Sequence, residues 1–217
     1  MYEILKEKLR EKYDFWDQDL QDSDLLDLTH YDLLRFISRN AEFKLYRYMP
    51  AEYFAIRNIE TQTIHLSYNG VLNDIYEGLP VLEKEIPYYK LQELNNLAAM
   101  TCFTECHNNI LMWSHYANQH TGLCVEYNIK QLNTDPLGAV KHLFPVLYGK
   151  KRYISRDIDS LIASHQDLNK AIAERYEYDG QELLDDVLPL FLWKGDAWKY
   201  EQEWRIVYMG IKSAEAV

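Results

Sequence analysis

The sequence has 217 residues, of which 47% are hydrophobic and 26% are charged, a composition typical of a soluble globular protein with one sizeable core. Its formal net charge of −11 argues against sequence-independent binding to nucleic acid, because such binding needs a basic surface that displaces counterions from phosphates. No apolar run in the sequence approaches the ~20 residues that a membrane-spanning helix requires. We therefore expect a single domain with no membrane partner.

The first 40 residues predict a helical, acidic extension. Residues 2–13 place Leu5, Leu9 and Tyr13 four apart, as in an amphipathic helix, and a second helix is expected after the capping pattern of Thr29 and Asp32. Six aspartates between positions 14 and 27 predict a solvated connection between the two helices. We assign residues 1–40 to this extension and residues 41–217 to the core domain.

Strands and helices alternate through the core domain. Strands are expected at 44–49, 63–67, 100–104, 121–128, 139–149 and 203–209, and Pro145 interrupts the strand at 139–149. Helices are expected after Pro50 and Pro87 and at 108–119, 157–176 and 181–193, while the glycines and asparagines of 67–80 predict a loop. This interleaving predicts an α+β (mixed α/β) fold, in which helices flank a small, mixed and mostly antiparallel sheet.

The cysteines indicate a reducing compartment. Their number is odd, and the chain starts without the pattern of a secretory signal peptide, so a secreted disulfide framework is not favoured. The expected location is the cytoplasm. The three cysteines are Cys102, Cys106 and Cys124.

The helix expected at 108–119 carries polar side chains on one side. At 100° per residue, its apolar stripe comprises Ile110, Met112, Trp113, Tyr116 and Ala117, and its remaining side carries Ser114, His115 and Asn118. Polar groups on a buried helix need partners in the protein, in water or in a ligand. The pattern fits either a structural histidine that contacts a neighbouring loop or the wall of a polar pocket.

A pair of glutamates lies in the stretch YEQEWR at 200–205. Alternation along a strand would place Glu201, Glu203 and Arg205 on one face and the aromatic residues on the other. Such a row could be a set of cross-strand ion pairs. The two carboxylates could instead polarise a ribose hydroxyl and stabilise a developing oxocarbenium ion.

An arginine between two tyrosines is the third candidate. In LYRYMP at 45–50, Arg47 alternates with Tyr46 and Tyr48 and so is expected on the opposite face of its strand. On an inner face it would be an anchor for phosphate, because its planar guanidinium offers a fork of donors. On an outer face it would be an ordinary surface residue.

Other kinds of site are not supported. His115 and His120 are five apart, which does not align them on one helix face as zinc ligands four apart would be. A thiol nucleophile at Cys102 would have no glycine-rich elbow or oxyanion loop beside it. The glycine-rich motifs that hold phosphates are absent from the sequence. No metal is therefore expected.

Four stretches, taken in order, resemble a bacterial family called domain of unknown function 2971. They are LYRYMP at 45–50, LSYNGVLNDIYEG at 66–78, CFTE with LMWSHYANQHTGLCVEY between 102 and 127, and KGDAWKYEQEWRIVY at 194–208. The resemblance spans residues 44–209, and the block at 111–127 is its most specific part. The name of the family implies no function.

The order of elements in that family is in turn similar to the ADP-ribosyltransferase fold, a likeness of folds that implies a split sheet and NAD as a substrate. By this resemblance Arg47 would hold a phosphate or ribose of NAD, and Trp113 or Tyr116 would line the nicotinamide pocket. Glu203 would hold the nicotinamide ribose while its C–N bond loosens, and Glu201 would orient the acceptor.

The same resemblance adds Tyr48, Ser114 and Arg205 to the expected NAD site and His115 to the expected catalytic residues. Two features depart from the pattern of ADP-ribosyltransferases. The stretch TCFTE at 101–105 stands where those enzymes carry a Ser-Thr-Ser strand. Those enzymes also rarely place polar catalytic groups on a helix in the position of the one expected at 108–119. The chain also stops soon after its last expected strand, where similar sequences continue, which suggests that a C-terminal piece is missing.

The leading hypothesis is thus a cytoplasmic NAD-dependent transferase, a bacterial toxin or phage-defence effector that modifies an unidentified protein or nucleic acid and has a partner protein or antitoxin. The alternative is a non-catalytic ligand-sensing or protein-interaction module in which Ser114, His115 and Glu203 form a buried polar network. A third hypothesis is a metal-dependent hydrolase or nuclease, whose activity would require zinc or magnesium.

Overall fold

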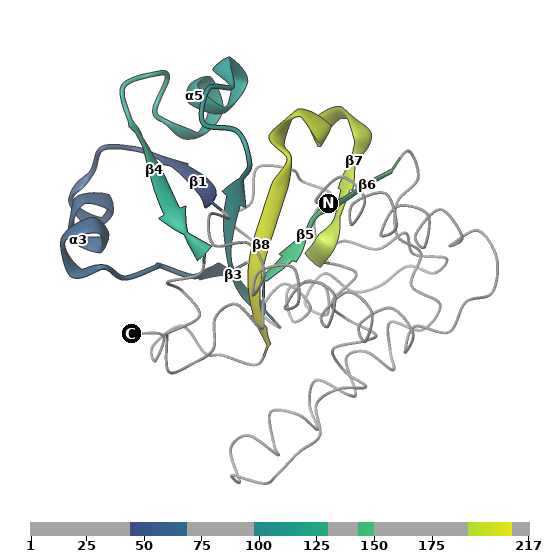
Figure 1. Ribbon diagram of the computed structural model, residues 1–217, viewed down its shortest axis with the longest axis horizontal. Coiled ribbons are helices and arrows are strands. Elements are labelled where there is room, and N and C mark those ends of the chain that lie inside the picture. The colour runs from purple at the N-terminus through teal and green to yellow at the C-terminus, as the bar shows by residue number, and fades with distance from the viewer. Residues whose placement is uncertain (1–43, 69–97, 130–142, 150–190, 210–217) are drawn as a thin grey trace, which may run out of the picture.

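The structure combines a small sheet with short helices (Figure 1). The computed structural model describes residues 44–68, 98–129, 143–149 and 191–209. Within these ranges helices and strands are mixed and the strands are mostly antiparallel, so the expected α+β class is confirmed. The helical extension expected at 1–40 lies outside the described residues.

The main sheet has six strands in the order β4-β1-β3-β8-β5, with β2 also paired to β3. Every pairing in it is antiparallel. A separate parallel pair joins β6 to β7. The bounds are Lys44–Met49 (β1), Ser67–Tyr68 (β2), Ala98–Thr104 (β3), Leu123–Asn128 (β4), Leu143–Pro145 (β5), Leu147–Gly149 (β6), Trp193–Gly195 (β7) and Glu203–Met209 (β8).

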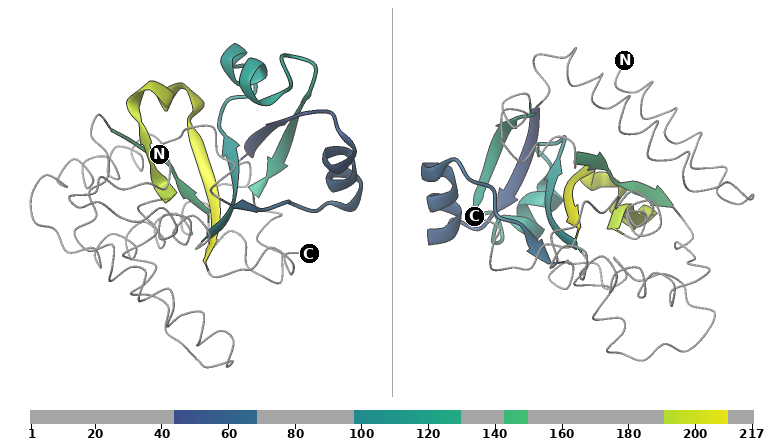
Figure 2. Two further views of the ribbon diagram at one scale, coloured as in Figure 1. Left: turned by 180° about the vertical axis from the view of Figure 1, so that it is seen from behind. Right: turned by 90° about the horizontal axis from the view of Figure 1, so that it is seen from below.

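Short helices stand between these strands. They are α3 (Tyr53–Thr61), α5 (Ile110–Tyr116) and the 3₁₀ helix η4 (Asp196–Glu201). In the views of Figures 1 and 2, α3 lies outside the β4–β1 edge of the sheet, whereas α5 lies near the η4 turn at one end of the strands. A hydrogen bond of 2.9 Å from Asn109 Nδ2 to the carbonyl of Tyr200 ties α5 to η4.

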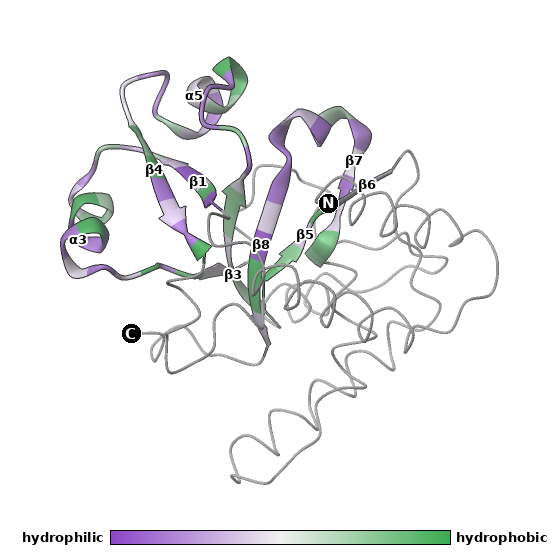
Figure 3. Cartoon of the chain, in the orientation of Figure 1, coloured by the Kyte–Doolittle hydropathy of each residue, from purple (hydrophilic) through white to green (hydrophobic). Residues whose placement is uncertain are grey.

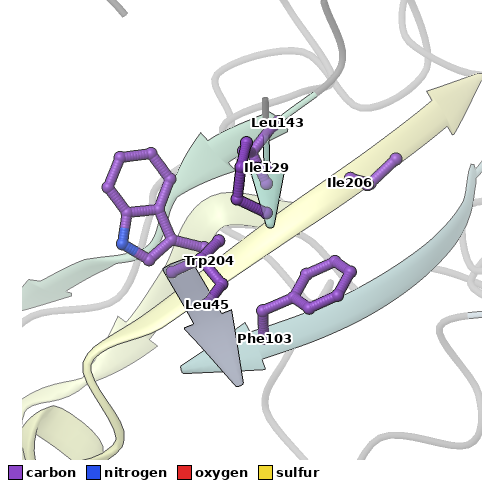
Figure 4. Packing of buried hydrophobic residues seen from close by; sticks show 6 residues of the cluster. All are labelled: Leu45, Phe103, Ile129, Leu143, Trp204 and Ile206. Carbon is purple, nitrogen blue, oxygen red and sulfur yellow. The ribbon is translucent and has the colours of Figure 1, made fainter. Parts of the chain in front are cut away.

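The main core lies on one face of the sheet (Figure 4). Trp204 and Ile206 alternate along β8 with Glu203 and Arg205, so the apolar pair faces the core while the charged pair faces the other way. Figure 3 shows the same strand changing from hydrophilic near η4 to hydrophobic further along. Each fully buried apolar side chain contributes about 1.5–3 kcal/mol to folding. The core cluster consists of Leu45, Phe103, Ile129, Leu143, Trp204 and Ile206.

The main sheet opens between β1 and β3. These strands share a single register pair, Tyr46 with Thr104, although β1 pairs with β4 along its whole length. Further along the same edge of β3, Ser67 of β2 pairs with Met100. The residues of β3 from 101 to 103 therefore lie between the two neighbouring strands, where neither of them continues the pairing.

The structure confirms most of the strands expected in the described ranges, including those at 44–49 and 203–209. The strand expected at 139–149 is, in its described part, two short strands: Pro145 is the last residue of β5, and the break before β6 falls at Val146. The strand expected at 63–67 is wrong, because the backbone is irregular until β2 begins at Ser67. The helix expected at 181–193 was predicted to end too late, because Trp193 already belongs to β7. The expected helices at 2–13, after Thr29, after Pro87 and at 157–176, and most of the loop at 67–80, lie outside the described residues.

No helix in the described ranges is long and apolar enough to cross a membrane.

Candidate functional site

A cavity of about 200 Å³ occupies the opening between β1 and β3. Its walls come from β1, β2, β3, α5 and the segment from β7 to β8, so it joins parts of the chain that are far apart in the sequence. The lining includes Arg47 and Tyr48 from β1, Tyr116 from α5, and Lys194, Glu201 and Glu203.

A buried lysine joins the two glutamates. Lys194 is 4% exposed, and its Nζ donates to Glu201 Oε2 at 2.5 Å and to Glu203 Oε2 at 2.9 Å. The ring of Trp198 lies 5.1 Å from the same nitrogen. Because little water reaches these groups, their charges are weakly screened. The ammonium thus holds two carboxylates that would otherwise repel each other.

Glu203 also forms a buried pair with Arg205. Arg205 Nε donates to Glu203 Oε1 at 2.8 Å and its Nη2 donates to Oε2 at 3.0 Å, which is a bidentate contact. Burial alone would raise the pKa of the Glu203 carboxyl, but the Arg205 guanidinium and the Lys194 ammonium outweigh it and hold that pKa well below its usual range. Glu203 is therefore ionised at neutral pH.

Glu201 has a different electrostatic setting. Its Oε1 accepts a hydrogen bond of 2.5 Å from the hydroxyl of Tyr116. Burial raises the pKa of the Glu201 carboxyl to about 7, the Lys194 ammonium lowers it, and the charge of Glu203 raises it. Two adjacent carboxyl groups whose pKa values are pushed apart can divide the roles of acid–base group and permanent anion. Glu201 fits the first role and Glu203 the second.

The turn between η4 and β8 sets the positions of both glutamates. Gln202 has a left-handed backbone, with φ 44° and ψ 53°, so Glu201 lies in the 3₁₀ helix and Glu203 begins the strand. The hydroxyl of Thr104 fixes the turn by donating to the carbonyl of Glu201 at 2.5 Å. The prediction that Glu201 shares a strand face with Glu203 and Arg205 is therefore wrong, although Lys194 still brings the two carboxylates together.

Arg47 and Tyr48 reach the cavity from β1. The hydroxyl of Tyr48 donates to the carbonyl of Cys106 at 3.0 Å and accepts from the backbone N–H of Asn109 at 3.3 Å, which makes it part of the framework. Arg47 Nη1 donates to the carbonyl of His65 at 3.5 Å, near the limit of a hydrogen bond. Of the two, Arg47 is the side chain that could more readily change its partner.

The helix α5 contributes less to the cavity than expected. Tyr116 and Met112 line it, whereas Trp113, Ser114 and His115 are not among the lining residues. Trp113 stacks edge-to-face on Tyr48, with ring centroids 5.1 Å apart, so it supports the wall from behind. His115 is exposed, and its ring centroid lies 6.4 Å from that of Trp198.

The prediction of a buried helix with a buried polar side is wrong. Ile110 is 72% exposed, although the apolar stripe was expected to bury it, and both His115 and Asn118 are exposed. The helix ends at Tyr116 because the following loop adopts positive φ angles at Asn118, Gln119 and His120. So short a helix buries only Met112. Asn118 Nδ2 donates to the hydroxyl of Thr121 at 3.0 Å.

Sequence reasoning missed Lys194, which is the centre of the charge network. The lysine opens the stretch KGDAWKYEQEWRIVY that carries the family resemblance, yet no pattern gave it a role. A usable signal was its place directly after the apolar run at 187–193, where a charged side chain is expected to need a buried partner. The sequence also gave no sign that Cys102 contacts this network, although a hydrogen bond from its thiol is among the causes that lower the pKa of the Glu203 carboxyl.

Within the described ranges, no group of three or more His, Cys, Asp or Glu side chains is arranged to hold a metal ion. The acidic side chains of the cavity are instead compensated by Lys194 and Arg205.

Comparison with known proteins gives one match. Residues 112–206 match the model of a family described as Protein of unknown function (DUF2971). No curated protein and no solved structure matches the chain. The matched range contains most of α5 together with Lys194, Glu201 and Glu203. Over residues 112–206 the chain is therefore similar to DUF2971 proteins, as its sequence motifs indicate.

Proposed function

We propose that this protein is a cytoplasmic NAD-dependent ADP-ribosyltransferase that transfers ADP-ribose to a macromolecular acceptor. One observation carries the proposal: Arg47 from the first strand of the sheet and the Glu201–Glu203 pair at the start of β8 line the same cavity. This cavity lies where the sheet opens, between β1 and β3. We also propose that the chain has the ADP-ribosyltransferase fold.

The chemistry would use the two carboxyl groups differently. The bond between nicotinamide and ribose breaks, its electron pair leaves with nicotinamide, and the ribose carbon gains positive charge. The ionised Glu203 would stabilise that charge, although Arg205 and Lys194 already offset part of its field. The acceptor then bonds to the ribose carbon and loses a proton, which Glu201, with a pKa of about 7, could take.

The size of the cavity limits how NAD would bind. Its volume of about 200 Å³ is below the ~300–1,000 Å³ of pockets that enclose a drug-sized ligand. It would therefore hold only the nicotinamide ribose, and the rest of the dinucleotide would lie outside. Arg47, whose guanidinium has a long contact to the carbonyl of His65, could turn to a phosphate at that point.

Transfer of ADP-ribose from labelled NAD tests the proposal. Purified full-length protein is incubated with biotinylated NAD and a bacterial lysate, and labelled macromolecules are detected on a blot. We expect wild type to label an acceptor. Glu203→Asp, which keeps the charge but withdraws the carboxylate by one methylene, should label it at least ~100-fold more slowly. Glu126→Gln, at an exposed position on β4, should behave as wild type. Absence of labelling by wild type would contradict the proposal.

A non-catalytic ligand-sensing module is the second candidate. The favouring observation is that Glu203 is already held by Arg205 and Lys194 at 6% exposure, as expected of a structural network. Glu203→Gln cannot separate the candidates, because breaking a buried ion pair is destabilising whether or not the residue is catalytic. Tyr116→Phe separates them better, because it keeps the ring but removes the hydrogen bond to Glu201. In a sensing module this variant should change ligand affinity while no nicotinamide is released by any form.

The proposed biological role is that of a toxin or phage-defence effector controlled by a partner protein or antitoxin. A transferase that consumes NAD in the cytoplasm would need restraint, and a bound partner protein would supply it. Co-purification of a stoichiometric partner that stops labelling would support this role.

A further inference from the structure

We propose that Tyr116 is a positioning residue, through which helix α5 holds the Glu201 carboxyl in place and favours its ionised form. The Tyr116 hydroxyl donates to Glu201 Oε1 at 2.5 Å, and the Lys194 ammonium donates to Oε2, so both oxygens of the carboxyl are held. The inference deepens the proposed function, and its kinetic part rests on that function, because Glu201 is the group that would take the proton of the acceptor. Its electrostatic part can be measured in the ligand-free protein.

Helix α5 is attached to η4 at both of its ends. Before the first turn, the Asn109 side chain caps the helix, and its Nδ2 donates to the carbonyl of Tyr200 at 2.9 Å. At the last residue of the helix, Tyr116 bonds to Glu201, the residue that follows Tyr200 in η4. Two attachments to consecutive residues fix the helix against η4. The Tyr116 hydroxyl is therefore held at the carboxyl by the fold itself.

The bond has one direction while Glu201 is ionised. A carboxylate can only accept, so the phenol donates. Burial raises the pKa of Tyr116 well above its usual value, and the phenol therefore keeps its proton at every pH at which the site would work. A hydrogen bond to the ionised form of an acid stabilises that form. Burial raises the pKa of the Glu201 carboxyl to about 7, and the bond from Tyr116 acts in the opposite direction.

Other groups also act on the Glu201 carboxyl. The Lys194 ammonium lowers its pKa, but this cation is shared with Glu203, whose charge raises the pKa of Glu201. Among the described residues, Tyr116 is the tyrosine whose hydroxyl bonds to the carboxyl itself. The titratable and charged groups around the carboxyl come from five elements and are Tyr116 of α5, Tyr148 of β6, Lys194 of β7, Tyr200 of η4 and Glu203 of β8.

Tyr148 provides a matched control within the same cluster. Burial raises its pKa as it raises that of Tyr116. Its hydroxyl, however, accepts from the backbone N–H of Glu203 at 2.9 Å instead of donating to a carboxylate oxygen. Tyr→Phe removes one oxygen atom at either position, once from a carboxyl and once from a backbone group. Both variants lose a structural hydrogen bond, but only Tyr116→Phe should change the proton affinity of Glu201.

The first test is a titration of the ligand-free, full-length protein by NMR, with ¹³C at the side-chain carboxyls of its glutamates. The signal of Glu201 is the one that Glu201→Gln lacks. It should titrate near pH 7 in wild type and about 1–2 pH units higher in Tyr116→Phe, the shift expected for losing one hydrogen bond to a charged group. Tyr148→Phe should leave the midpoint unchanged. No shift in Tyr116→Phe, or an equal shift in both variants, would overturn the inference.

A second variant keeps the hydroxyl and the packing of the ring. Replacement of Tyr116 by 3-fluorotyrosine makes the phenol a stronger donor, because fluorine withdraws electrons from the ring. The Glu201 carboxyl should then titrate at a lower pH than in wild type, opposite to the shift in Tyr116→Phe. Shifts of both variants in the same direction would point to a general disturbance of the site and would overturn the inference.

The third test is the pH dependence of nicotinamide release from NAD. The pH at which kcat is half-maximal should rise in Tyr116→Phe by the same amount as the carboxyl midpoint. A raised KM with an unshifted pH profile would mean that Tyr116 contacts the ligand instead of positioning Glu201, and would overturn the inference. If the carboxyl midpoint shifts as expected but no form of the protein releases nicotinamide, the proposed function is wrong and the role of Tyr116 stands.

Discussion

At the scale of single residues, the site depends on a balance of buried charge. Lys194 and Arg205 face Glu201 and Glu203, and all four side chains are at most 6% exposed. Each cation therefore compensates a carboxylate that has lost its water, and Lys194 contacts both carboxylates. Removing one member should leave an uncompensated charge in a place of low dielectric constant.

Lys194→Met tests this balance. The variant keeps a long apolar side chain but removes the shared cation, so the free energy of unfolding in urea at neutral pH should fall by about 3–5 kcal/mol. Lys199→Met, at an exposed lysine of the neighbouring 3₁₀ helix η4, should change it by less than about 0.5 kcal/mol. Equal effects of the two substitutions would show that the buried lysine is not needed for charge compensation.

Glu105 predicts a specific dependence of stability on pH. Burial raises the pKa of its carboxyl from 4.5 to about 7, while the hydrogen bond from Trp204 Nε1 at 2.8 Å acts in the opposite direction. Between these two pH values the folded state binds the proton more tightly than the unfolded state. The contribution of Glu105 to stability is therefore present below about pH 4.5 and is lost as the pH rises towards 7.

Glu105→Gln should remove that dependence, because glutamine stays neutral and can still accept from the Trp204 indole. We expect the variant to match wild type near pH 4.5. It should exceed wild type by roughly 1–2 kcal/mol at about pH 8, as measured by urea unfolding. A constant difference between the two proteins at both pH values would contradict the buried, proton-binding state of this carboxyl.

At the scale of elements, the loop after α5 sets how the helix meets the sheet. A Cβ atom on Gly122 would lie 2.3 Å from the carbonyl oxygen of Met49 and 2.8 Å from the backbone of Ala117. Backbone atoms on both sides cannot give way as a side chain can. The glycine therefore permits the contact between β1 and the end of α5, which places Tyr116 beside the cavity.

Gly122→Ala should accordingly lower the free energy of unfolding by about 2–4 kcal/mol, because the clash forces β1 and α5 apart. Gly195→Ala is the matched control, since its Cβ would meet only the side chain of Trp198 at 3.9 Å. This control should cost less than about 1 kcal/mol. Chemical denaturation of the two variants in parallel measures the difference. An equal loss of unfolding free energy in both would show that the close backbone packing at Gly122 does not exclude a Cβ atom.

The elements that sequence alone could predict are those with a strong local pattern. The alternation of EWRIVYM predicts β8, because one face of that strand is apolar, and KLYRYM predicts β1 because it is rich in aromatic residues that favour strands. The helix at 108–119 was predicted with the wrong burial, because periodicity gives the spacing of apolar residues and not the surface they face. Ile110 fits the apolar stripe and is nevertheless 72% exposed.

At the scale of the whole molecule, the site depends on contacts that no local pattern contains. Lys194 and Glu201 are close in sequence, but Arg47 and Tyr116 meet them only because β1 and β3 separate around a cavity. The sequence could single out the ExE pair and Arg47 as candidate site residues, whereas the cation that Lys194 shares between the two carboxylates required three-dimensional contacts. Strand pairing brings these groups together, and a single sequence does not contain that pairing.

The most direct measurement is the initial rate of nicotinamide release from NAD by the purified full-length protein between about pH 5 and pH 9. We expect wild type to release nicotinamide at a rate that rises as Glu201 loses its proton near pH 7. Glu201→Gln should be slower by ~10²–10⁴-fold and should lack that rise. Lys199→Met should match wild type. If wild type releases no nicotinamide at any pH, the cavity is not a site of NAD cleavage and the central proposal is wrong.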